Sequence, residues 1–164
     1  MRLRIGQGWD RHRLEPGLPC ILGGVLFEDA PAGPVAHSDG DVAAHAVADA
    51  LLGAASLGDL GRLFPDTDPA YAGADSLTLL ADVAARVRAA GWRLVNADLT
   101  VICEAPRIAP RAAAMAARLA AALGVPADDV SIKATRGEGL GPEGRGEAIT
   151  VQAVVLLSGE ESGS

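Results

Sequence analysis

The sequence predicts an α/β protein, a two-layer α/β sandwich in which helices cover one face of a single mixed sheet. Three observations support this prediction. Strand-like and helix-like patterns alternate along the chain, only three segments are long enough for substantial helices, and the last strand-like segment is apolar on both faces. Three helices are too few to cover both faces of a large sheet, so one face is left for another partner.

Length and composition agree with one folded domain. The chain has 164 residues, of which 49% are hydrophobic and 21% are charged. These values are typical of a globular domain rather than of a disordered chain. We expect a single domain over residues 1–157 and a polar tail over residues 158–164.

The first half of the chain is expected to supply a strand, a hairpin and a long helix. Alternating apolar residues predict a strand over Leu3–Asp10, and two short apolar runs predict a hairpin over Pro19–Phe27. Glu28–Asp39 contains prolines and no periodicity, which is typical of a loop. Apolar residues at helical spacing then predict a helix over Asp41–Leu57.

The second half alternates between helices and strands. Its expected elements are an irregular acidic segment over Asp59–Pro69, a helix over Asp75–Ala90, a strand over Leu94–Cys103, a helix over Pro110–Leu123, and strands over Val130–Thr135 and Ala148–Leu157 joined by a loop over Arg136–Glu147. One face of the first of these strands is expected to hold Val95, Ala97, Leu99, Val101 and Cys103.

Two helices have candidate side-chain caps. Asp39 or Asp41 would cap the first helix, and Asp75 or Ser76 would cap the second. Short polar side chains at these positions accept the free N–H groups of a first turn. Each pair leaves open which of its two members is the cap.

The segment Ala148–Leu157 bears on assembly. Its side chains are apolar at both odd and even positions, so a sheet face without helices would expose apolar groups to water. Such faces are commonly buried against another copy of the chain. We therefore expect a homo-oligomer.

Charge and cysteine content exclude several classes of protein. The net charge is −7, which disfavours binding to nucleic acid or to an anionic membrane surface. No apolar run reaches the length of a membrane span, and the N-terminus has no apolar leader segment. Cys20 and Cys103 lie far apart in the sequence, so we expect buried free thiols and a cytoplasmic location.

Three residues form a candidate metal site. Asp10 and His12 stand at i and i+2 near the end of the first strand and therefore point to the same side, and His45 lies on the first helix. Two imidazoles and one carboxylate suit a divalent ion, zinc above all, with a fourth position open for substrate. Asp41 or Asp49, one turn either side of His45, could orient its ring. The alternative is a hydrogen-bonded core histidine and a turn aspartate, and spacing alone does not separate the two.

Three further segments have polar groups suited to phosphate or sugar. His37–Asp41 precedes a helix N-terminus and could hold a phosphate, especially with a cation beside it. The acidic residues of Asp59–Asp68 could bind hydroxyl groups, and Lys133–Gly141 combines cations, a hydroxyl, a carboxylate and glycines. The alternatives are an ordinary capped turn for the first segment, a solvated loop for the second and a flexible hairpin loop for the third, which the glycine content alone would favour.

Taken together, the motifs resemble a known family. The segments concerned are Gly6–His12 (GQGWDRH), His37–Ala54 (HSDGDVAAHAVADALLGA), Gly58–Asp68 (GDLGRLFPDTD), Asn96–Thr100 (NADLT), Ala105–Arg107 (APR), Ile132–Thr135 (IKAT) and Gly144–Glu147 (GRGE). In this order they resemble the 2-C-methyl-D-erythritol 2,4-cyclodiphosphate synthases over nearly the whole chain.

The resemblance implies an enzyme of the non-mevalonate isoprenoid pathway. It implies a metal-dependent phosphorus–oxygen lyase that cyclises 4-diphosphocytidyl-2-C-methyl-D-erythritol 2-phosphate to the 2,4-cyclodiphosphate and releases CMP. It also implies a homotrimer with active sites at subunit interfaces, one Zn²⁺ per subunit, and Mg²⁺ or Mn²⁺ on the substrate diphosphate. A trimer agrees with the apolar sheet face expected above.

The resemblance assigns roles to residues by motif. Asp10, His12 and His45 resemble the zinc ligands, and His37, Thr135 and Arg136 stand at catalytic positions. The positions that resemble substrate contacts are Asp10, His12, His37, Ser38, Asp59, Leu60, Gly61, Phe64, Pro65, Asp66, Thr67, Asp68, Cys103, Glu104, Ala105, Pro106, Arg107, Ile108, Ala109, Thr135, Arg136, Gly137, Glu138, Pro142 and Arg145. Among these, Cys103–Ala109 resembles a cytidine pocket contributed by the neighbouring subunit. Thr135 and Glu138 resemble contacts to the diphosphate and its metal, and Arg145 and Glu147 resemble residues of the trimer channel.

Two positions depart from the family pattern. Arg136 stands where the family usually has a threonine that helps to stabilise the transition state, and a guanidinium differs from a hydroxyl in reach and geometry. Pro142 replaces an aromatic residue near the trimer channel, in which the resemblance implies a bound isoprenoid diphosphate.

Two other functions are compatible with the same residues. A metal-dependent phosphohydrolase would use the same ligand set to activate water, and a trimeric binding module would use the metal for structure alone. The product formed from the diphosphocytidyl substrate separates the synthase from the hydrolase, and an open coordination position separates catalysis from structure.

Overall fold

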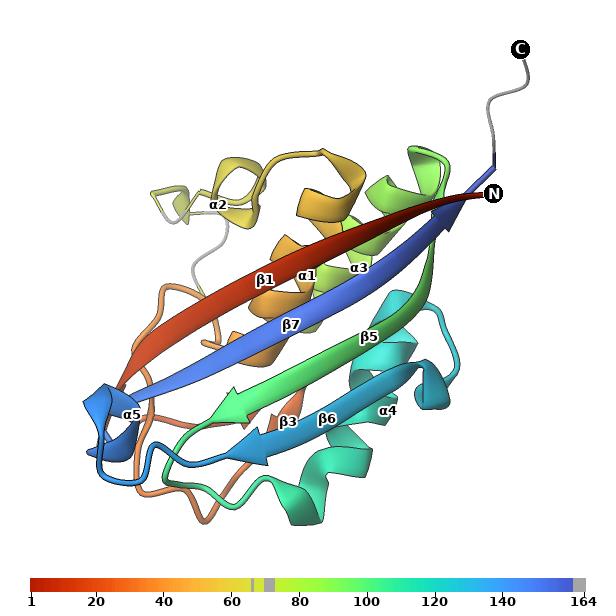
Figure 1. Ribbon diagram of the computed structural model, residues 1–164. Coiled ribbons are helices and arrows are strands. Elements are labelled where there is room, and N and C mark those ends of the chain that lie inside the picture. The colour runs from red at the N-terminus through yellow and green to blue at the C-terminus, as the bar shows by residue number, and fades with distance from the viewer. Residues whose placement is uncertain (66, 70–72, 161–164) are drawn as a thin grey trace.

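The computed structural model describes residues 1–65, 67–69 and 73–160, and it contains a five-stranded sheet with helices behind one face (Figure 1). The strands of the sheet are β1 (Arg2–Glu15), β4 (Gly33–Pro34), β5 (Trp92–Ile102), β6 (Val130–Thr135) and β7 (Ala148–Gly159), and a separate hairpin pairs β2 (Ile21–Leu22) with β3 (Val25–Leu26). The helices are α1 (Val42–Ala55), α2 (Leu60–Leu63), α3 (Ser76–Ala89), α4 (Ala112–Leu123) and α5 (Gly141–Gly144), with 3-10 turns η2 (Ala109–Arg111) and η3 (Ala127–Asp129). The predicted α/β class and single covered face are confirmed.

The sheet is mixed, as predicted, and its order is β4-β1-β7-β5-β6. The central strand β7 pairs antiparallel with β1 on one side and with β5 on the other. β5 pairs parallel with β6, and the segment between them includes α4, because a parallel pair needs a long crossover. As a result, β1 and β5 run in the same direction and end at the same edge of the sheet.

Glycines on β1 allow α1 to lie directly on the sheet. A Cβ added to Gly6 would lie 1.9 Å from the backbone oxygen of Ala50, and one added to Gly8 would lie 1.8 Å from that of Ala46. No side chain fits in that space. The small alanines of α1 and these two glycines therefore bring the helix close to the strand that carries Asp10 and His12.

None of the described helices lies over the opposite face of the sheet (Figure 1). Apolar side chains on it are exposed in the single chain, with Ile5 at 74%, Leu3 at 55%, Trp9 at 49% and Val154 at 46%. The apolar face expected from Ala148–Leu157 is thus present. The homo-oligomer that would cover it stays a prediction.

The N- and C-terminal strands are longer than predicted. β1 continues five residues beyond Asp10 because β7 pairs with it as far as Arg13 and β4 pairs with Leu14 and Glu15. Asp10 and His12 therefore lie within a strand rather than at a strand end. β7 reaches Gly159, so the predicted tail over residues 158–164 includes two strand residues, Ser158 and Gly159; residues 161–164 lie outside the described part.

Three segments expected to be irregular contain short elements. Glu28–Asp39 includes β4, Asp59–Pro69 includes α2, and Arg136–Glu147 includes α5. The helix expected over Pro110–Leu123 begins as the 3-10 turn η2 before α4. β4 forms by pairing with the end of β1, and α2 is capped by the side chain of Asp59. Such contacts leave no periodic pattern in the sequence.

One residue of β5 does not follow the predicted alternation. Ala97, Leu99, Val101 and Cys103 are buried as expected, but Val95 is 40% exposed. The pairing of β5 with β7 shifts between Leu94 and Asn96, and this bulge turns Val95 away from the core.

The helix caps are resolved within each predicted pair. Asp41, not Asp39, caps α1 by accepting from the N–H groups of Ala43 and Ala44 at 3.1 and 3.0 Å. Asp75, not Ser76, caps α3. Both remaining residues, Asp39 and Ser76, are therefore free for other contacts.

Both cysteines are buried and free, as predicted. Burial raises the pKa of the Cys20 thiol to about 12 and that of Cys103 to about 11, so both thiols are neutral at physiological pH. No described helix is long and apolar enough to cross a membrane.

Candidate metal and substrate site

Asp10, His12 and His45 come together between β1 and α1. The Nε2 atom of His12 and the Nδ1 atom of His45 both lie 3.2 Å from the same oxygen, Oδ2 of Asp10. One ligand atom from each residue lies within 4.8 Å of the others, and all three residues are half-buried. The three residues proposed from the sequence as metal ligands thus form one cluster.

The hydrogen-bond partner of His12 decides which ring nitrogen is free. Its Nδ1 atom lies 2.7 Å from the backbone oxygen of Val35. A carbonyl oxygen can only accept, so Nδ1 carries the hydrogen and the neutral ring has its lone pair on Nε2. That lone pair points toward Asp10.

His45 has the opposite arrangement with the same result. Its Nε2 atom lies 2.9 Å from the hydroxyl oxygen of Ser76 and 3.3 Å from that of Ser38. If Nε2 carries the hydrogen, the lone pair on Nδ1 points toward Asp10. Two nitrogen lone pairs and a carboxylate oxygen then converge without a hydrogen between them, an arrangement that repels unless a cation or protons lie there.

The electrostatics of the cluster agree with this conclusion. Burial alone would raise the pKa of Asp10, but hydrogen bonds from His12 and His45 and their positive charge outweigh it and hold this pKa well below its ordinary value. The hydrogen bond to Asp10 raises the pKa of His12 above its ordinary value, against the effect of burial. Without a metal, protons balance the carboxylate, and a divalent cation competes for the same lone pairs.

The donor set fits a divalent ion such as Zn²⁺. Two imidazole nitrogens and one carboxylate oxygen are typical zinc ligands, and three protein ligands leave a tetrahedral ion one position for substrate. The fit rests on the convergence of these atoms in this chain.

Neither aspartate predicted to orient His45 makes a described side-chain hydrogen bond to its ring, although the backbone oxygen of Asp41 accepts from the backbone N–H of His45 at 3.1 Å. Asp41 is fully buried and accepts from the N–H groups of Gly23 and Gly24 at 2.8 and 2.6 Å, in addition to capping α1. Asp49 accepts from the N–H of Leu60 at 2.7 Å and so anchors α2. Both are occupied elsewhere, and Ser76, which the sequence analysis treated only as a possible cap, contacts the ring of His45 instead.

The predicted substrate residues His37 and Ser38 lie beside the cluster. Ser38 contacts His45, as described, and also accepts from the N–H of Gly40 at 3.3 Å. The Nε2 atom of His37 lies 3.4 Å from the backbone oxygen of Asp68, so the two predicted substrate segments meet here. His37 is exposed and open to a ligand.

The segment Asp59–Asp68 is fastened to α1 through Asp49. Within it, Asp59 caps α2 through the N–H of Arg62 at 3.0 Å and pairs with the side chain of Arg62. Phe64 and Pro65 are half-buried, and Thr67 and Asp68 are exposed. The predicted contact Asp66 lies outside the described residues.

A second hollow forms where β5 and β6 end. It is a cavity of about 370 Å³, and its lining includes Cys103, Glu104, Pro106–Pro110 and Ala134–Arg136. The side chain of Glu104 accepts from the N–H of Gly137 at 3.0 Å, which joins the two loops. The sequence assigned these loops to the cytidine and to the diphosphate separately, and the structure places them together.

The remaining predicted residues lie near α5, at the same edge of the sheet. Glu138 is exposed and has a positive φ of 52°. Arg145 makes two hydrogen bonds of 2.9 Å to Glu147, so its guanidinium is already paired, and Pro142 lies in α5. The neighbouring Glu143 lies outside every motif identified in the sequence. It is 8% exposed and pairs with Arg11 at 2.7 Å.

A mixed α/β sheet with a converging cluster of two imidazoles and a carboxylate defines an α/β protein with a possible metal-binding site. Residues 3–158 match the YgbB family, and the chain belongs to this family. It is 58% identical to the 2-C-methyl-D-erythritol 2,4-cyclodiphosphate synthase of Azoarcus sp. (strain BH72) over 157 residues, which cover 94% of this chain and 95% of that protein. The family predicted from the motifs, and its synthase activity, are confirmed.

Solved structures agree with the fold. A 2-C-methyl-D-erythritol 2,4-cyclodiphosphate synthase structure described as a CDP-bound form has a TM-score of 0.86 and 41% identity, covering 94% of this chain and all of that one (100%). The bifunctional IspDF of Campylobacter jejuni has a TM-score of 0.92 and 38% identity, covering 98% of this chain but 43% of that one.

Proposed function

We propose that this chain cyclises 4-diphosphocytidyl-2-C-methyl-D-erythritol 2-phosphate to the 2,4-cyclodiphosphate and releases CMP. The observation that carries the proposal is the convergence of His12 Nε2 and His45 Nδ1 on one oxygen of Asp10, each at 3.2 Å. This is a cation site beside a substrate loop. Family membership supplies the substrate class.

The metal at Asp10, His12 and His45 is proposed to be zinc, one ion per chain. When bound, it neutralises phosphate oxygens and so reduces the repulsion between two anionic groups. A second ion, Mg²⁺ or Mn²⁺, is proposed near Thr135 and Glu138, whose oxygens suit a hard cation.

The reaction is an intramolecular phosphoryl transfer, in which an oxygen of the 2-phosphate attacks the β-phosphorus and the CMP oxygen leaves. A phosphate monoester is already anionic, so the protein needs no strong base, and positioning is its main contribution. Ser38 and the exposed ring of His37 lie beside the metal ligands, where they can bind phosphate oxygens. Thr135 and Arg136 line the second hollow and can donate to the diphosphate.

The second hollow is proposed to bind cytidine, largely through main-chain atoms of Cys103–Ala109. Within one chain, β7 lies between β1 and β5, so the hollow and the metal ligands are on different strands of the sheet. We propose a homotrimer in which the hollow of one copy faces the metal site of the next. The exposed apolar face supports such an assembly, and the free buried thiols suit a cytoplasmic enzyme.

The test uses the diphosphocytidyl substrate with the zinc-loaded protein, followed by phosphorus NMR. A cyclic diphosphate and CMP support the synthase, and an open phosphate product would instead support a phosphohydrolase. His45→Ala should lose zinc and activity together, whereas Asp82→Asn, an exposed change on α3, should keep both. Full turnover by a zinc-free variant would refute the proposed site.

A further inference from the structure

His45 is held from a second helix by a buried hydroxyl. Ser76, the first residue of α3, is 1% exposed, and its hydroxyl lies 2.9 Å from Nε2 of His45. The same hydroxyl makes a short hydrogen bond to Asp39, and the backbone N–H of Ser76 donates to the other carboxylate oxygen of Asp39 at 3.1 Å. Ser76 therefore joins His45 and Asp39, which lie 31 and 37 residues before it, in one chain of contacts.

The direction of each hydrogen in this chain follows from its acceptors. An ionised carboxylate can only accept, so the single hydroxyl hydrogen of Ser76 is donated to Asp39. The oxygen of Ser76 is then left to accept from His45, which requires a hydrogen on Nε2. The lone pair of the neutral ring is thereby placed on Nδ1, the atom that faces Asp10 at 3.2 Å.

We propose that Asp39 and Ser76 are positioning residues that hold His45 in the tautomer able to bind the metal. The inference rests on the proposed metal site and adds to it the part that orients the ligand. The hydroxyl of Ser76 is hydrogen-bonded to the carboxylate of Asp39 and accepts from the ring N–H of His45. These contacts also make the other ring nitrogen a better electron-pair donor to the metal. Asp39 belongs to the His37–Asp41 motif, and its contact with α3 explains why an acidic residue stands there.

The same contacts fix the loop that carries His37. The N–H of Asp39 donates to the backbone oxygen of Ala74 at 3.1 Å, and the N–H of Gly73 donates to that of His37 at 2.8 Å. The start of α3 therefore orients both the metal ligand His45 and the predicted catalytic residue His37.

The test measures metal affinity in the absence of substrate. Ser76→Ala and Asp39→Asn should each weaken Zn²⁺ binding by about 10–100-fold, the usual cost of removing a partner that orients a ligand, as measured by competition with a chromophoric chelator. Nitrogen NMR of the metal-free imidazole should show a loss of the Nε2–H form of neutral His45. Ser76→Thr keeps the hydroxyl and should recover most of the affinity.

Asp75→Asn is the matched control. Asp75 caps the same helix through Leu77 and Thr78 but makes no described contact with His45. Asparagine keeps an oxygen that can cap, so this variant removes a carboxylate next to Ser76 and should leave Zn²⁺ affinity unchanged. Equal losses in Ser76→Ala and Asp75→Asn, or an unchanged tautomer in Ser76→Ala, would overturn the inference. Reduced affinity in a protein that forms no cyclic product would preserve the inference and refute the proposed function.

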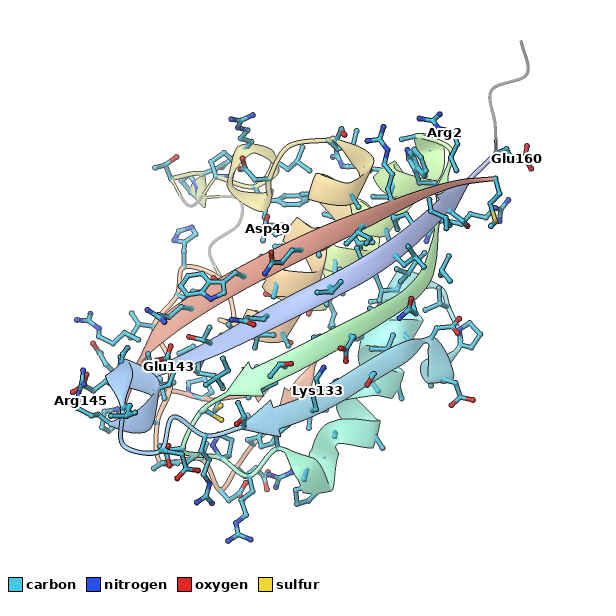
Figure 2. All side chains as sticks on the ribbon, viewed as in Figure 1. Arg2, Asp49, Lys133, Glu143, Arg145 and Glu160 are labelled. Carbon is cyan, nitrogen blue, oxygen red and sulfur yellow. The ribbon has the colours of Figure 1, made fainter. Side chains whose placement is uncertain are left out.

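A second inference concerns arginines at the far end of the sheet. A cavity of about 920 Å³ is lined by Arg2, Arg88, Arg93 and Trp92, near the labelled Arg2 and Glu160 in Figure 2. Arg2 and Arg4 both stack on the ring of Trp92, at 5.0 and 4.9 Å from its centroid. Stacking on a buried indole orders these two guanidinium groups.

The positive charge around this cavity is not balanced by ion pairs. Of the 14 Lys and Arg residues, seven make ion pairs among the described residues: Arg11, Arg13, Arg62, Arg86, Arg111, Lys133 and Arg145. Arg2, Arg88 and Arg93, which line the cavity, are among the other seven, although Arg88 also donates to the backbone oxygen of Leu123 at 2.9 Å. Among the described residues of the lining, Glu160 is acidic. In a chain of net charge −7, three guanidinium groups without a described carboxylate partner favour a multivalent anion.

We infer that this cavity binds a small soluble di- or triphosphate, separately from the metal site. One guanidinium group can bind a phosphate through two parallel hydrogen bonds. A hollow lined by several guanidinium groups therefore suits a compact anion. Trp92 is already covered by two arginines, so its ring is not available to stack on a base. The site therefore recognises the phosphates themselves.

The probe is inorganic pyrophosphate, titrated into metal-free protein by calorimetry and by fluorescence of Trp92 in a Trp9→Phe background. Arg2→Ala and Arg93→Ala should each weaken binding roughly tenfold, as expected for a charged hydrogen bond. Arg118→Ala, which removes an unpaired exposed arginine from α4, should leave it unchanged. The inference would be overturned by a dissociation constant above roughly 10 mM, where association is negligible. Equal affinity in all three variants, or preferential binding to anionic vesicles, would overturn it as well.

Discussion

The metal cluster and the hollow beyond β5 and β6 are built in different ways. Asp10, His12 and His45 lie on a long strand and a buried helix, and each imidazole has a partner on its second nitrogen. The hollow is lined by loops, and Thr135 and Arg136 on its wall are exposed. One region is oriented by its own chain, whereas the other is open to solvent.

This difference indicates where a second copy of the chain is needed. The metal site takes its ligands and their orienting contacts from one chain. The hollow lies at the same edge of the sheet as the end of β1 but is separated from it by intervening strands. If a neighbouring copy completes the active site, it does so by covering the open region and not by adding ligands to the cluster.

The largest expected effect comes from preventing assembly. Ile5→Lys places a charge on the uncovered face, where Ile5 is 74% exposed in the single chain. Analytical ultracentrifugation should show monomers, activity should fall by at least about 100-fold because oriented reactants are lost, and Zn²⁺ binding should remain. Lys at a site exposed in the monomer should cost less than about 0.5 kcal/mol of fold stability.

Ala85→Lys provides the control for Ile5→Lys. Ala85 is exposed and lies on α3, which covers the other side of the sheet (Figure 1), so this variant should stay assembled and active. An active monomer of Ile5→Lys would contradict the comparison, because the open region would then function without a neighbour.

The next effect tests how α1 positions the cluster. Gly8→Ala would place a Cβ 1.8 Å from the backbone oxygen of Ala46, so the helix carrying His45 must move away from β1. We expect a loss of about 1–3 kcal/mol in unfolding free energy, as in other overpacked cores, and weaker Zn²⁺ binding. Chemical denaturation and chelator competition measure the two effects.

Gly53→Ala is the matched control on α1 itself. A Cβ at Gly53 meets nothing within 4 Å, and alanine in a helix is more favourable than glycine by about 0.5–1 kcal/mol. This variant should be more stable and bind Zn²⁺ normally. If Gly8→Ala also bound Zn²⁺ normally, the close approach of α1 would not be what assembles the site.

Much of this architecture could be predicted from the sequence. Periodicity identified the main helices and strands, and the spacing of Asp10 and His12 placed them on one side of a strand. The partner of His45 could not be predicted, because Ser76 is 31 residues away and reaches the ring only through the packing of α3 on α1. Asp41 and Asp49 had the right helical spacing but are occupied by backbone N–H groups, which no periodicity reveals.

The hollow was predictable only in parts for the same reason. The motif resemblance located Cys103–Ala109 and Thr135–Gly137, but their contact depends on the parallel pairing of β5 with β6 and on the bond from Gly137 to Glu104. The β-bulge that exposes Val95 is likewise a property of pairing with β7. Local patterns predict elements, whereas these contacts arise between elements.

A smaller expected effect is a difference in the pH dependence of stability between the metal-free and the zinc-bound protein. The lowered pKa of Asp10 adds stability above its unfolded value of 3.8 that is lost as pH falls through the lowered pKa. The raised pKa of His12 adds stability below its unfolded value of 6.5 that is lost as pH rises through the raised pKa. The contribution of Asp10 and His12 to the stability of the metal-free protein should therefore be greatest between pH 3.8 and pH 6.5.

Zinc should offset the loss of stability that the metal-free protein shows at higher pH, since the ion binds the unprotonated ring of His12. The rise in melting temperature on adding Zn²⁺ should be larger at pH 8 than at pH 5.5, measured by calorimetry with and without chelator. A zinc effect independent of pH would show that the imidazoles are not ligands.

The smallest expected effect lies in the hollow. Glu104→Ala removes the acceptor for the N–H of Gly137, a hydrogen bond of 3.0 Å between half-buried groups. Because such a bond contributes about 0.5–1.5 kcal/mol, CMP should bind the zinc-loaded protein roughly 3–10-fold more weakly, with Zn²⁺ affinity unchanged. Asp128→Ala removes the same charge from the exposed turn η3, before the start of β6, and should leave calorimetric CMP binding as it is. If Glu104→Ala weakened Zn²⁺ binding instead, the hollow and the metal cluster would be coupled within one chain, and they could not be treated as separate regions.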